Sequence, residues 1–315
     1  MSPRFDNRIT RLLGIDLPIV QAPMGYIARA ALASAVSNAG AMGIIETSSG
    51  RLDEVRLEIA KMRDLTDRPF GVNIAQAFVN DPAIVDFVAG NGVRFVTTSA
   101  GDPTRYTAAL KDAGITVFHV VPTLRAALKA VAAGVDGLVV EGSEGGGFKN
   151  PRDVSTMVLL PLVASKVDVP IIAAGGFLDG PTMAAGLALG AEGVQLGTVM
   201  VATAESPIHD NWKQAIVAAS ETDSVLLNRH RAPAVRVLRT DLTNALEFDT
   251  GTDAMTHMAS FAKLYFDGDM DAALPLGGAV AGRIERIRPV AEVIEECARG
   301  CLETIERLRD GYAST

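Results

Sequence analysis

The sequence predicts an α/β fold, a (β/α)8 TIM barrel with a small helical insertion after its eighth strand. Short apolar runs recur eight times along the chain, separated by segments with the apolar spacing of amphipathic helices. The runs are apolar at consecutive positions, as in parallel strands that are buried on both faces. Eight such units in succession favour closure into a barrel.

The predicted strands are short and nearly evenly spaced. They are expected at 18–22, 42–45, 70–74, 93–97, 116–121, 137–140, 170–174 and 193–196. Helices are expected at 28–38, 52–65, 82–91, 104–112 and 123–133. Most of these helices end close to a glycine, which is the usual C-terminal stop signal.

The helix expected after the eighth strand does not follow that strand directly in the sequence. Residues 201–276 intervene, and we expect them to form a mainly helical lid that covers the barrel mouth and helps to select the substrate. A long amphipathic pattern then predicts a closing helix over 283–313. The predicted domains are therefore a barrel formed by 1–200 with 277–315, and a lid formed by 201–276.

The composition of the chain argues against several classes of protein. The 315 residues carry a net charge of −8, so a basic surface for nucleic acid is not expected. No apolar stretch is long enough to span a membrane and no secretory signal is visible, which favours a cytoplasmic enzyme. Cys297 and Cys301 lack the further ligands of a zinc site and are expected to be reduced thiols, so no metal is predicted.

Two glycine-containing segments follow the last two predicted strands. Gly175-Gly176 closes strand 7, and Gly197-Thr198 closes strand 8. In barrels of this type the loops after these strands commonly bind phosphate through backbone N–H groups, and glycine lets the backbone approach closely. The pattern predicts a phosphorylated ligand.

Other strand ends are mostly neutral. Strand 1 ends in Ala22-Pro23-Met24, whose turn and polarizable side chain suit a flat ring, and strand 3 ends near the amide of Asn73. The glycine run at 145–147 fits neither the dinucleotide fingerprint nor a P-loop. No GxSxG or HExxH motif is present. Such a pocket suits a phosphorylated planar cofactor that brings its own reactivity.

Several motifs together resemble one family. They are QAPM at 21–24, RPFGVN at 68–73, VP at 121–122, the loop 141–147, IIAAGG at 171–176 and GAEGVQLGT at 190–198. The chain resembles the FMN-dependent nitronate monooxygenases, formerly called 2-nitropropane dioxygenases, and the related FMN-dependent enoyl-ACP reductases. The likeness covers 8–205 and resumes near 277–284.

The resemblance implies FMN at the barrel mouth. By matching position, four residues are expected to contact the isoalloxazine: Ala22, Pro23, Met24 and Asn73. Five more are expected at or near the phosphate: Gly175, Gly176, Gln195, Gly197 and Thr198. The same loops are those in which the glycines predicted a phosphate site.

The chain departs from the family in the loop after strand 6. Where the family has Gly-Gly-His beside the flavin, this chain has Gly146-Gly147-Phe148, which we expect to line the substrate site. Phenylalanine can neither remove a proton nor hold a nitronate oxygen. Typical nitronate oxidation is therefore in question, and an apolar pocket for a larger substrate is the alternative.

Two residues are candidates to replace the imidazole. Lys149 follows Phe148 and could bind an anionic or thioester substrate, or it could be an ordinary surface lysine. His119, near the end of strand 5, could act as general acid or base, or it could be packed in the core. Both alternatives remain open at this point.

Three functions follow from these features. The first is an FMN oxidoreductase of the nitronate monooxygenase type, reoxidised by O₂ or another acceptor. The alternative is a reductase or dehydrogenase acting on a C=C bond of an enone or of a CoA or ACP thioester, with NAD(P)H binding transiently because no separate nucleotide domain is present. The third is a flavin-binding module without turnover. Expected partners are a small-molecule substrate and a second copy in a homodimer.

Overall fold

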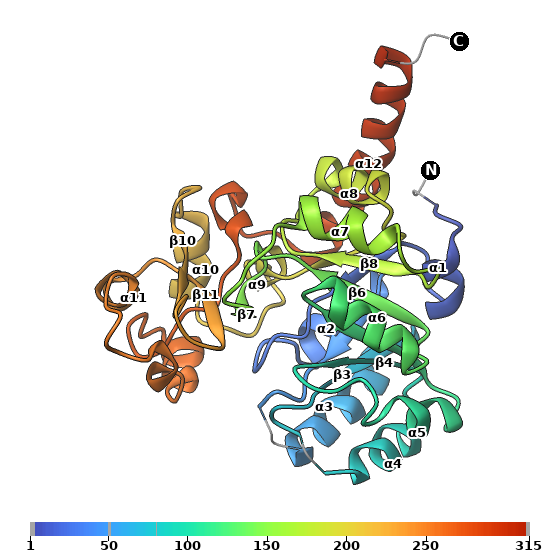
Figure 1. Ribbon diagram of the computed structural model, residues 1–315, viewed down its shortest axis with the longest axis horizontal. Coiled ribbons are helices and arrows are strands. Elements are labelled where there is room, and N and C mark those ends of the chain that lie inside the picture. The colour runs from blue at the N-terminus through green and yellow to red at the C-terminus, as the bar shows by residue number, and fades with distance from the viewer. Residues whose placement is uncertain (1–3, 50–51, 80, 313–315) are drawn as a thin grey trace.

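The computed structural model describes residues 4–49, 52–79 and 81–312. Its centre is a sheet of eight parallel strands surrounded by helices (Figure 1). The strands are β1 (Ile19–Gln21), β2 (Gly43–Ile45), β3 (Phe70–Ala75), β4 (Phe95–Ser99), β5 (Thr116–Val121), β6 (Gly137–Glu141), β8 (Ile171–Ala174) and β9 (Gly193–Leu196). All eight predicted strands are confirmed.

The sheet closes into a barrel between its two ends. Its strand order is β1-β9-β8-β6-β5-β4-β3-β2. Val20 of β1 forms a parallel bridge with Met42, next to β2. Gln21 N donates to Met42 O at 2.9 Å, and Met42 N donates to Ile19 O at the same distance. The molecule is therefore a (β/α)8 TIM barrel, as the sequence predicts.

The outer helices follow the predicted spacing. They are α2 (Ala30–Asn38), α3 (Leu52–Leu65), α4 (Ala83–Gly90), α5 (Thr107–Asp112), α6 (Leu124–Ala132), α7 (Thr156–Ala164), α8 (Gly180–Ala188) and α12 (Val290–Tyr312). The predicted start of the closing helix at 283 is wrong, and its predicted end at 313 lies outside the described residues. Ala279–Arg283 form a 3-10 turn instead, and α12 begins after Pro289, which disfavours helical geometry in the residue before it.

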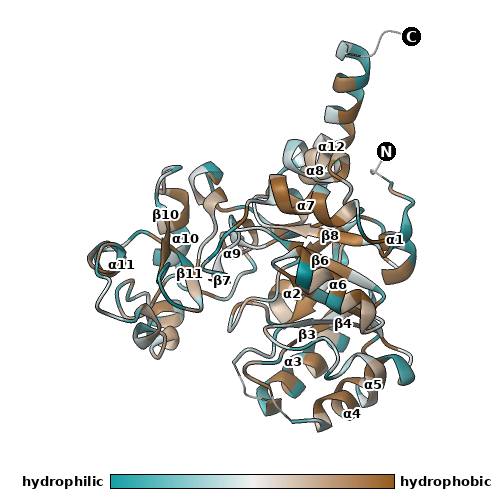
Figure 2. Ribbon diagram, in the orientation of Figure 1, coloured by the Kyte–Doolittle hydropathy of each residue, from teal (hydrophilic) through white to brown (hydrophobic). Residues whose placement is uncertain are grey.

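The barrel interior and the layer under the helices are separate apolar clusters. Inward-facing Val20, Phe95 and Phe118 share one cluster, in which the two rings meet edge-on at 5.4 Å. A short N-terminal helix, α1 (Arg8–Leu13), packs into the same cluster and closes the barrel at the N-terminal ends of the strands. Alternate strand residues face the helices, and brown apolar colour accordingly follows the strands in Figure 2. The opposite end, at the C-terminal strand ends, is the mouth.

The insertion after β9 contains strands as well as helices. Its helical elements are α9 (Thr198–Val201), α10 (Asp210–Val217), α11 (Asp241–Glu247), η1 (Ala254–His257) and η2 (Lys263–Asp267). Between them, β10 (Ser224–Leu227) pairs antiparallel with β11 (Ala234–Leu238). β11 also pairs with β7 (Gly147–Lys149), which belongs to the loop after β6. The division into two domains stays a prediction, but the lid and the strand-6 loop share one small sheet.

Within residues 4–49, 52–79 and 81–312, every helix is too short or too polar to reach across a bilayer. Cys297 and Cys301 are both buried as free thiols on α12.

Candidate functional site

The amide of Asn73 is fixed at the mouth. Asn73 is the inward-facing residue near the end of β3 and is buried. Its Nδ2 donates to Thr97 Oγ1 at 2.9 Å and to Thr97 O at 3.2 Å. Both partners belong to β4, so the side chain is held in place before any ligand arrives.

Gly175 and Gly176 form a tight turn after β8. Their φ angles are +89° and +90°, which L side chains rarely adopt. A Cβ on Gly175 would lie 3.0 Å from Gly142 O and 3.2 Å from Thr156 Oγ1. Glycine is therefore required here by backbone conformation and by close approach of the strand-6 loop.

The second predicted phosphate segment lies beside this turn. Gly197 is the N-cap of α9, and Thr198 Oγ1 accepts a hydrogen bond from Gly278 N at 2.9 Å. Ala279 N donates to Glu144 O at 2.8 Å, and a Cβ on Gly176 would lie 3.7 Å from Glu144 Cβ. The structure thus brings the segments after β8 and β9 together around the strand-6 loop.

Gln195 points into the barrel between these segments. It is buried in β9, and its Oε1 has no hydrogen-bond partner among the described residues. An unpaired buried amide oxygen is costly unless a ligand or a water satisfies it. Together with the glycine turn, this side chain fits a ligand that offers a hydrogen-bond donor at the mouth.

The segment after β1 lies against the β9 loop. Ala22 N donates to Leu196 O at 2.8 Å, and a Cβ on Gly197 would lie 3.5 Å from Ala22 Cβ. Pro23 and Met24 follow, and Met24 O accepts from Ala28 N at 2.8 Å. The structure therefore places Ala22, Pro23 and Met24 at the same edge of the mouth as the predicted phosphate segments.

A buried carboxylate that the sequence analysis missed anchors this edge. Glu46 follows β2, is fully buried, and pairs with Arg29 Nη2 at 2.8 Å. It also accepts from Tyr26 N at 3.2 Å and from Ser49 N at 2.9 Å. An acidic residue directly after an apolar strand was the available signal. Its contacts show that it orders the loops after β1 and β2.

Lys149 is buried, and the interpretation of it as a surface lysine is wrong. Its side chain is 5% exposed, and its Nζ lies 2.8 Å from Glu141 Oε1 at the end of β6. Nζ also donates to Gly146 O and Phe148 O, both at 3.2 Å. A Cβ on Gly145 would lie 2.5 Å from Glu141 Oε1. The ion pair therefore ties the two ends of the glycine run together and leaves no space for a side chain beneath it.

Phe148 projects from the opposite side of β7. Its ring lies 6.0 Å from that of Phe78, in the loop after β3, and both side chains are partly exposed. Gly147 lies beside it, and a Cβ on Gly146 would lie 2.9 Å from the backbone of Gly277. The two rings therefore reach towards each other from opposite loops of the mouth.

His119 is not brought together with these residues. Its neighbours Phe118 and Val120 belong to the barrel interior, so His119 faces the surrounding helices. It is 4% exposed, and its Nδ1 lies 2.7 Å from Thr98 Oγ1. Desolvation by burial lowers its pKa to about 4. This geometry matches the packed-core alternative, so His119 has no catalytic role in the function proposed below.

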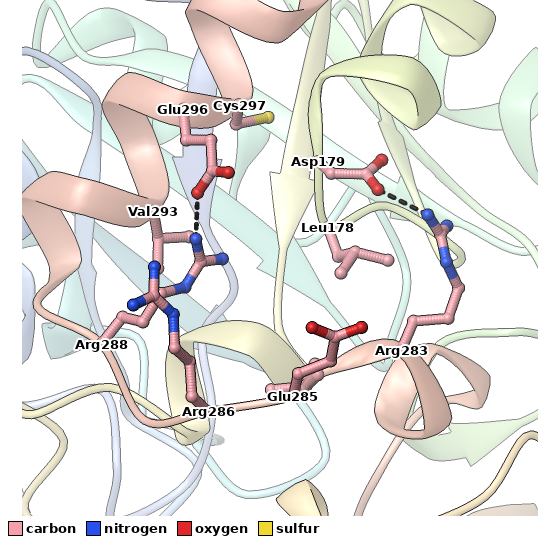
Figure 3. A pocket seen from close by; sticks show the side chains of 10 residues that line it. Leu178, Asp179, Arg283, Glu285, Arg286, Arg288, Val293, Glu296 and Cys297 are labelled. Atoms are coloured by element: carbon pink, nitrogen blue, oxygen red, sulfur yellow. Dashed lines mark hydrogen bonds and ion pairs between the residues drawn. The ribbon is translucent and has the colours of Figure 1, made fainter.

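A pocket of about 230 Å³ lies between the start of α8, the segment that leads into α12, and α12 itself, and none of the mouth residues described above lines it (Figure 3). Arg283 pairs there with Asp179 at 2.5 Å, and Arg288 pairs with Glu296. Arg286 pairs with Glu292, so each arginine that lines this pocket already binds a carboxylate and is not free to bind an anionic ligand.

Comparison with known proteins decides the family. The sequence profile described as "Nitronate monooxygenase" matches residues 6–85 and 76–300, which is most of the chain. The chain belongs to the nitronate monooxygenase family. Relatives of this chain are named as oxidoreductases, so this chain is an oxidoreductase. The family is flavin-dependent in general.

Three similar proteins carry different names. FabK from Thermotoga maritima is 38% identical with a TM-score of 0.91, over 98% of this chain and 100% of that one. A (3aS,4S,5R,7aS)-5-hydroxy-7a-methyl-1-oxo-octahydro-1H-indene-4-carboxyl-CoA dehydrogenase from Rhodococcus jostii is 38% identical, over 76% of this chain and 67% of its own. A nitronate monooxygenase from Paraburkholderia phytofirmans is 32% identical, over 95% of this chain and 96% of its own.

Proposed function

We propose that this protein binds FMN at the barrel mouth and oxidises or reduces the carbon–carbon bond next to the carbonyl of a thioester or an enone. The observation that carries the substrate class is the aromatic pair of Phe148 and Phe78. Two partly exposed rings at the mouth favour a substrate with an apolar carbon body over a small anionic nitronate. The name of the CoA-thioester dehydrogenase among the relatives supports the same class.

The residues present fit FMN. Gly175 and Gly176 turn without Cβ atoms, and Gly197 and Thr198 begin a helical turn beside them. These four residues would hold the phosphate through backbone N–H groups. The unpaired Gln195 Oε1 would accept from the ring system.

The ring itself would lie over the edge formed by the loop after β1. Ala22, Pro23 and Met24 would contact it there, with Asn73 held beside it by its hydrogen bonds to β4. When bound, FMN supplies two-electron chemistry at a carbon atom.

Glu141 is the ionisable side chain that faces the mouth from β6. We assign it the proton at the α-carbon, which it would accept in oxidation and return in reduction. Lys149 positions that carboxylate from a buried site, and the aromatic pair limits water around the acyl chain. When bound, FMN would supply the two-electron acceptor or donor for the hydride at the β-carbon, while Glu141 handles the proton at the α-carbon.

The decisive experiment follows flavin absorbance anaerobically. The FMN-loaded protein is mixed with a panel of acyl-CoA and enoyl-CoA thioesters and enones, with and without NAD(P)H. We expect saturable bleaching by a saturated thioester, or reoxidation of NAD(P)H-reduced flavin by an unsaturated one. Rates equal to those of free FMN across the whole panel would exclude this function.

Nitronate oxidation is the second candidate, favoured by the 32% identity to a nitronate monooxygenase along nearly the whole chain. Oxygen uptake with alkyl nitronates tests it. Uptake no faster than that of free FMN removes this candidate. A protein that binds FMN but passes neither test would be the flavin-binding module without turnover.

A further inference from the structure

The turn after β1 holds Tyr26 in an unusual backbone conformation. Its φ is +65°, in the left-handed region that residues with a side chain rarely adopt. Met24 O accepts hydrogen bonds from Ile27 N at 3.1 Å and from Ala28 N at 2.8 Å, so residues 24–28 form one closed turn. Such a conformation persists only where its surroundings enforce it, and it is found most often at functional sites.

The loop after β2 enforces this turn. Glu46 is fully buried, and its Oε1 accepts from Tyr26 N at 3.2 Å. A Cβ on Gly25 would lie 2.8 Å from Ser48 Oγ, so the turn packs directly on that loop. Met24, which the proposed function places against the flavin ring, is therefore held in one rigid unit with Tyr26.

The ring of Tyr26 contacts the lid. Its centroid lies 6.3 Å from that of Phe261 and 6.4 Å from that of Tyr265, within the usual range for aromatic pairs. Phe261 and Tyr265 stack on each other at 5.3 Å, with 11° between their planes. Tyr265 is buried, and its carbonyl oxygen accepts from His209 N, at the start of α10, at 2.6 Å. The three rings therefore join the turn after β1 to the body of the lid.

The lid is attached to a second side of the mouth by contacts of another kind. β11 pairs with β7 through the backbone, and Arg236 Nε donates to Ser143 O at 2.6 Å. These contacts hold the lid to the loop after β6, which carries Phe148. In the sheet β8 and β9 separate β6 from β1, so the lid spans the mouth between two loops. Strand pairing fixes the lid at one loop, and packing of rings fixes it at the other.

We propose that Tyr26 is a positioning residue for the substrate site, because its ring holds the lid in place at the flavin edge of the mouth. This role rests on the proposed function, in which the substrate lies between the flavin ring and the side chains of the mouth. The ring contacts the lid and not the loops that would hold the phosphate. Its loss should therefore weaken the binding of substrate and leave the binding of FMN nearly unchanged.

Three substitutions separate the ring of Tyr26 from its backbone. Tyr26→Gly removes the ring but keeps the N–H group that binds Glu46, and glycine adopts a positive φ without strain. Tyr26→Phe keeps the ring and should behave as the wild type. Phe266→Ala is the matched control, because it removes a ring from the same lid segment that is 45% exposed.

Hydrogen exchange of the protein without added FMN measures the attachment of the lid directly. In Tyr26→Gly we expect the amides of residues 258–268 to exchange at least tenfold faster, while residues 22–29 keep their protection because the turn remains. Tyr26→Phe and Phe266→Ala should exchange as the wild type does. Unchanged exchange of 258–268 in Tyr26→Gly overturns the proposal, whether or not the protein binds FMN.

Steady-state kinetics of the FMN-loaded protein give the second readout. With a thioester or enone that the wild type turns over, Tyr26→Gly should raise KM at least tenfold, while kcat and the Kd for FMN change less than threefold. Tyr26→Phe and Phe266→Ala should keep the KM of the wild type. A lower kcat at unchanged KM, or a Kd for FMN that rises as much as KM, would contradict a role in substrate positioning. If the wild type turns over no member of the panel, the proposed function fails, and the exchange measurement alone decides whether Tyr26 holds the lid.

Discussion

Lys149 Nζ and Glu141 Oε1 are 2.8 Å apart, and the glycine run at the barrel mouth lies between the two residues in the sequence. The lysine side chain is almost fully buried, while the carboxylate is a quarter exposed. Removing one member of such a pair leaves the other without its partner, which is the costly case for buried charges. The pair therefore links the shape of the strand-6 loop to the charge at the mouth.

The substitution Lys149→Met should destabilise the protein by about 3 kcal/mol, because Glu141 loses its partner and the loop loses its tether. Thermal and denaturant unfolding measure this change. Glu141→Gln should be milder in stability, because an amide can still accept from Lys149. It should nevertheless lower kcat at least tenfold if Glu141 handles the substrate proton. Unchanged kcat in Glu141→Gln would remove that assignment and leave the FMN site untouched.

The pairing of Phe148 with Phe78 predicts a gain of function. Phe148→His places an imidazole at the position where the resemblance to the family leads us to expect one, and we expect oxygen uptake with alkyl nitronates to rise at least tenfold. Activity on enones or thioesters should fall because the apolar contact is lost. Phe78→His is the matched control, since it changes the other ring of the same pair. Equal effects of the two substitutions would show that polarity of the mouth matters, and not the position of the imidazole.

A substitution at Gly175 can separate an effect on phosphate binding from the general effect of backbone strain. Gly175→Ala combines a φ of +89° with a Cβ only 3.0 Å from Gly142 O. Gly134→Ala is the control, because it has a φ of +85° and open space around its Cβ. Both should lose roughly 1 kcal/mol of stability through backbone strain. Only Gly175→Ala should also weaken FMN binding, by at least tenfold in a fluorescence titration. Equal FMN affinity in both variants would place the phosphate elsewhere.

Strand positions were predictable because each strand is a short apolar run between helical patterns. The direction of His119 was not predictable, because residues 117–121 are apolar on both sides of it. Only the structure shows that Phe118 and Val120 belong to the barrel interior. The pairing of Lys149 with Glu141 was not predictable from the sequence either. Its side chain turns inward because β7 pairs with β11, and Phe148 lies opposite Val235, far along the chain. Such long-range pairing of a three-residue strand leaves no local pattern in the sequence. The lid strands β10 and β11 form a local hairpin instead, and they were missed because residues 201–276 were expected to be mainly helical.

The buried position of His119 predicts that the folded protein loses stability at acid pH. Burial lowers its pKa to about 4 from the ordinary 6.5, so the unfolded chain binds more protons between these two pH values. The part of the free energy of unfolding that comes from burying a neutral imidazole is therefore fully present above pH 6.5. The free energy of unfolding should fall by up to roughly 3 kcal/mol as the pH drops towards 4.

Urea denaturation at pH 7, 6, 5 and 4 measures this decline. His119→Gln should flatten it, whereas the same substitution at the exposed His230 should not. His119→Gln should also keep the pH profile of kcat/KM, because the side chain faces the helices and not the mouth. A variant with normal flavin binding that loses its pH-dependent activity would instead restore His119 as a catalytic group.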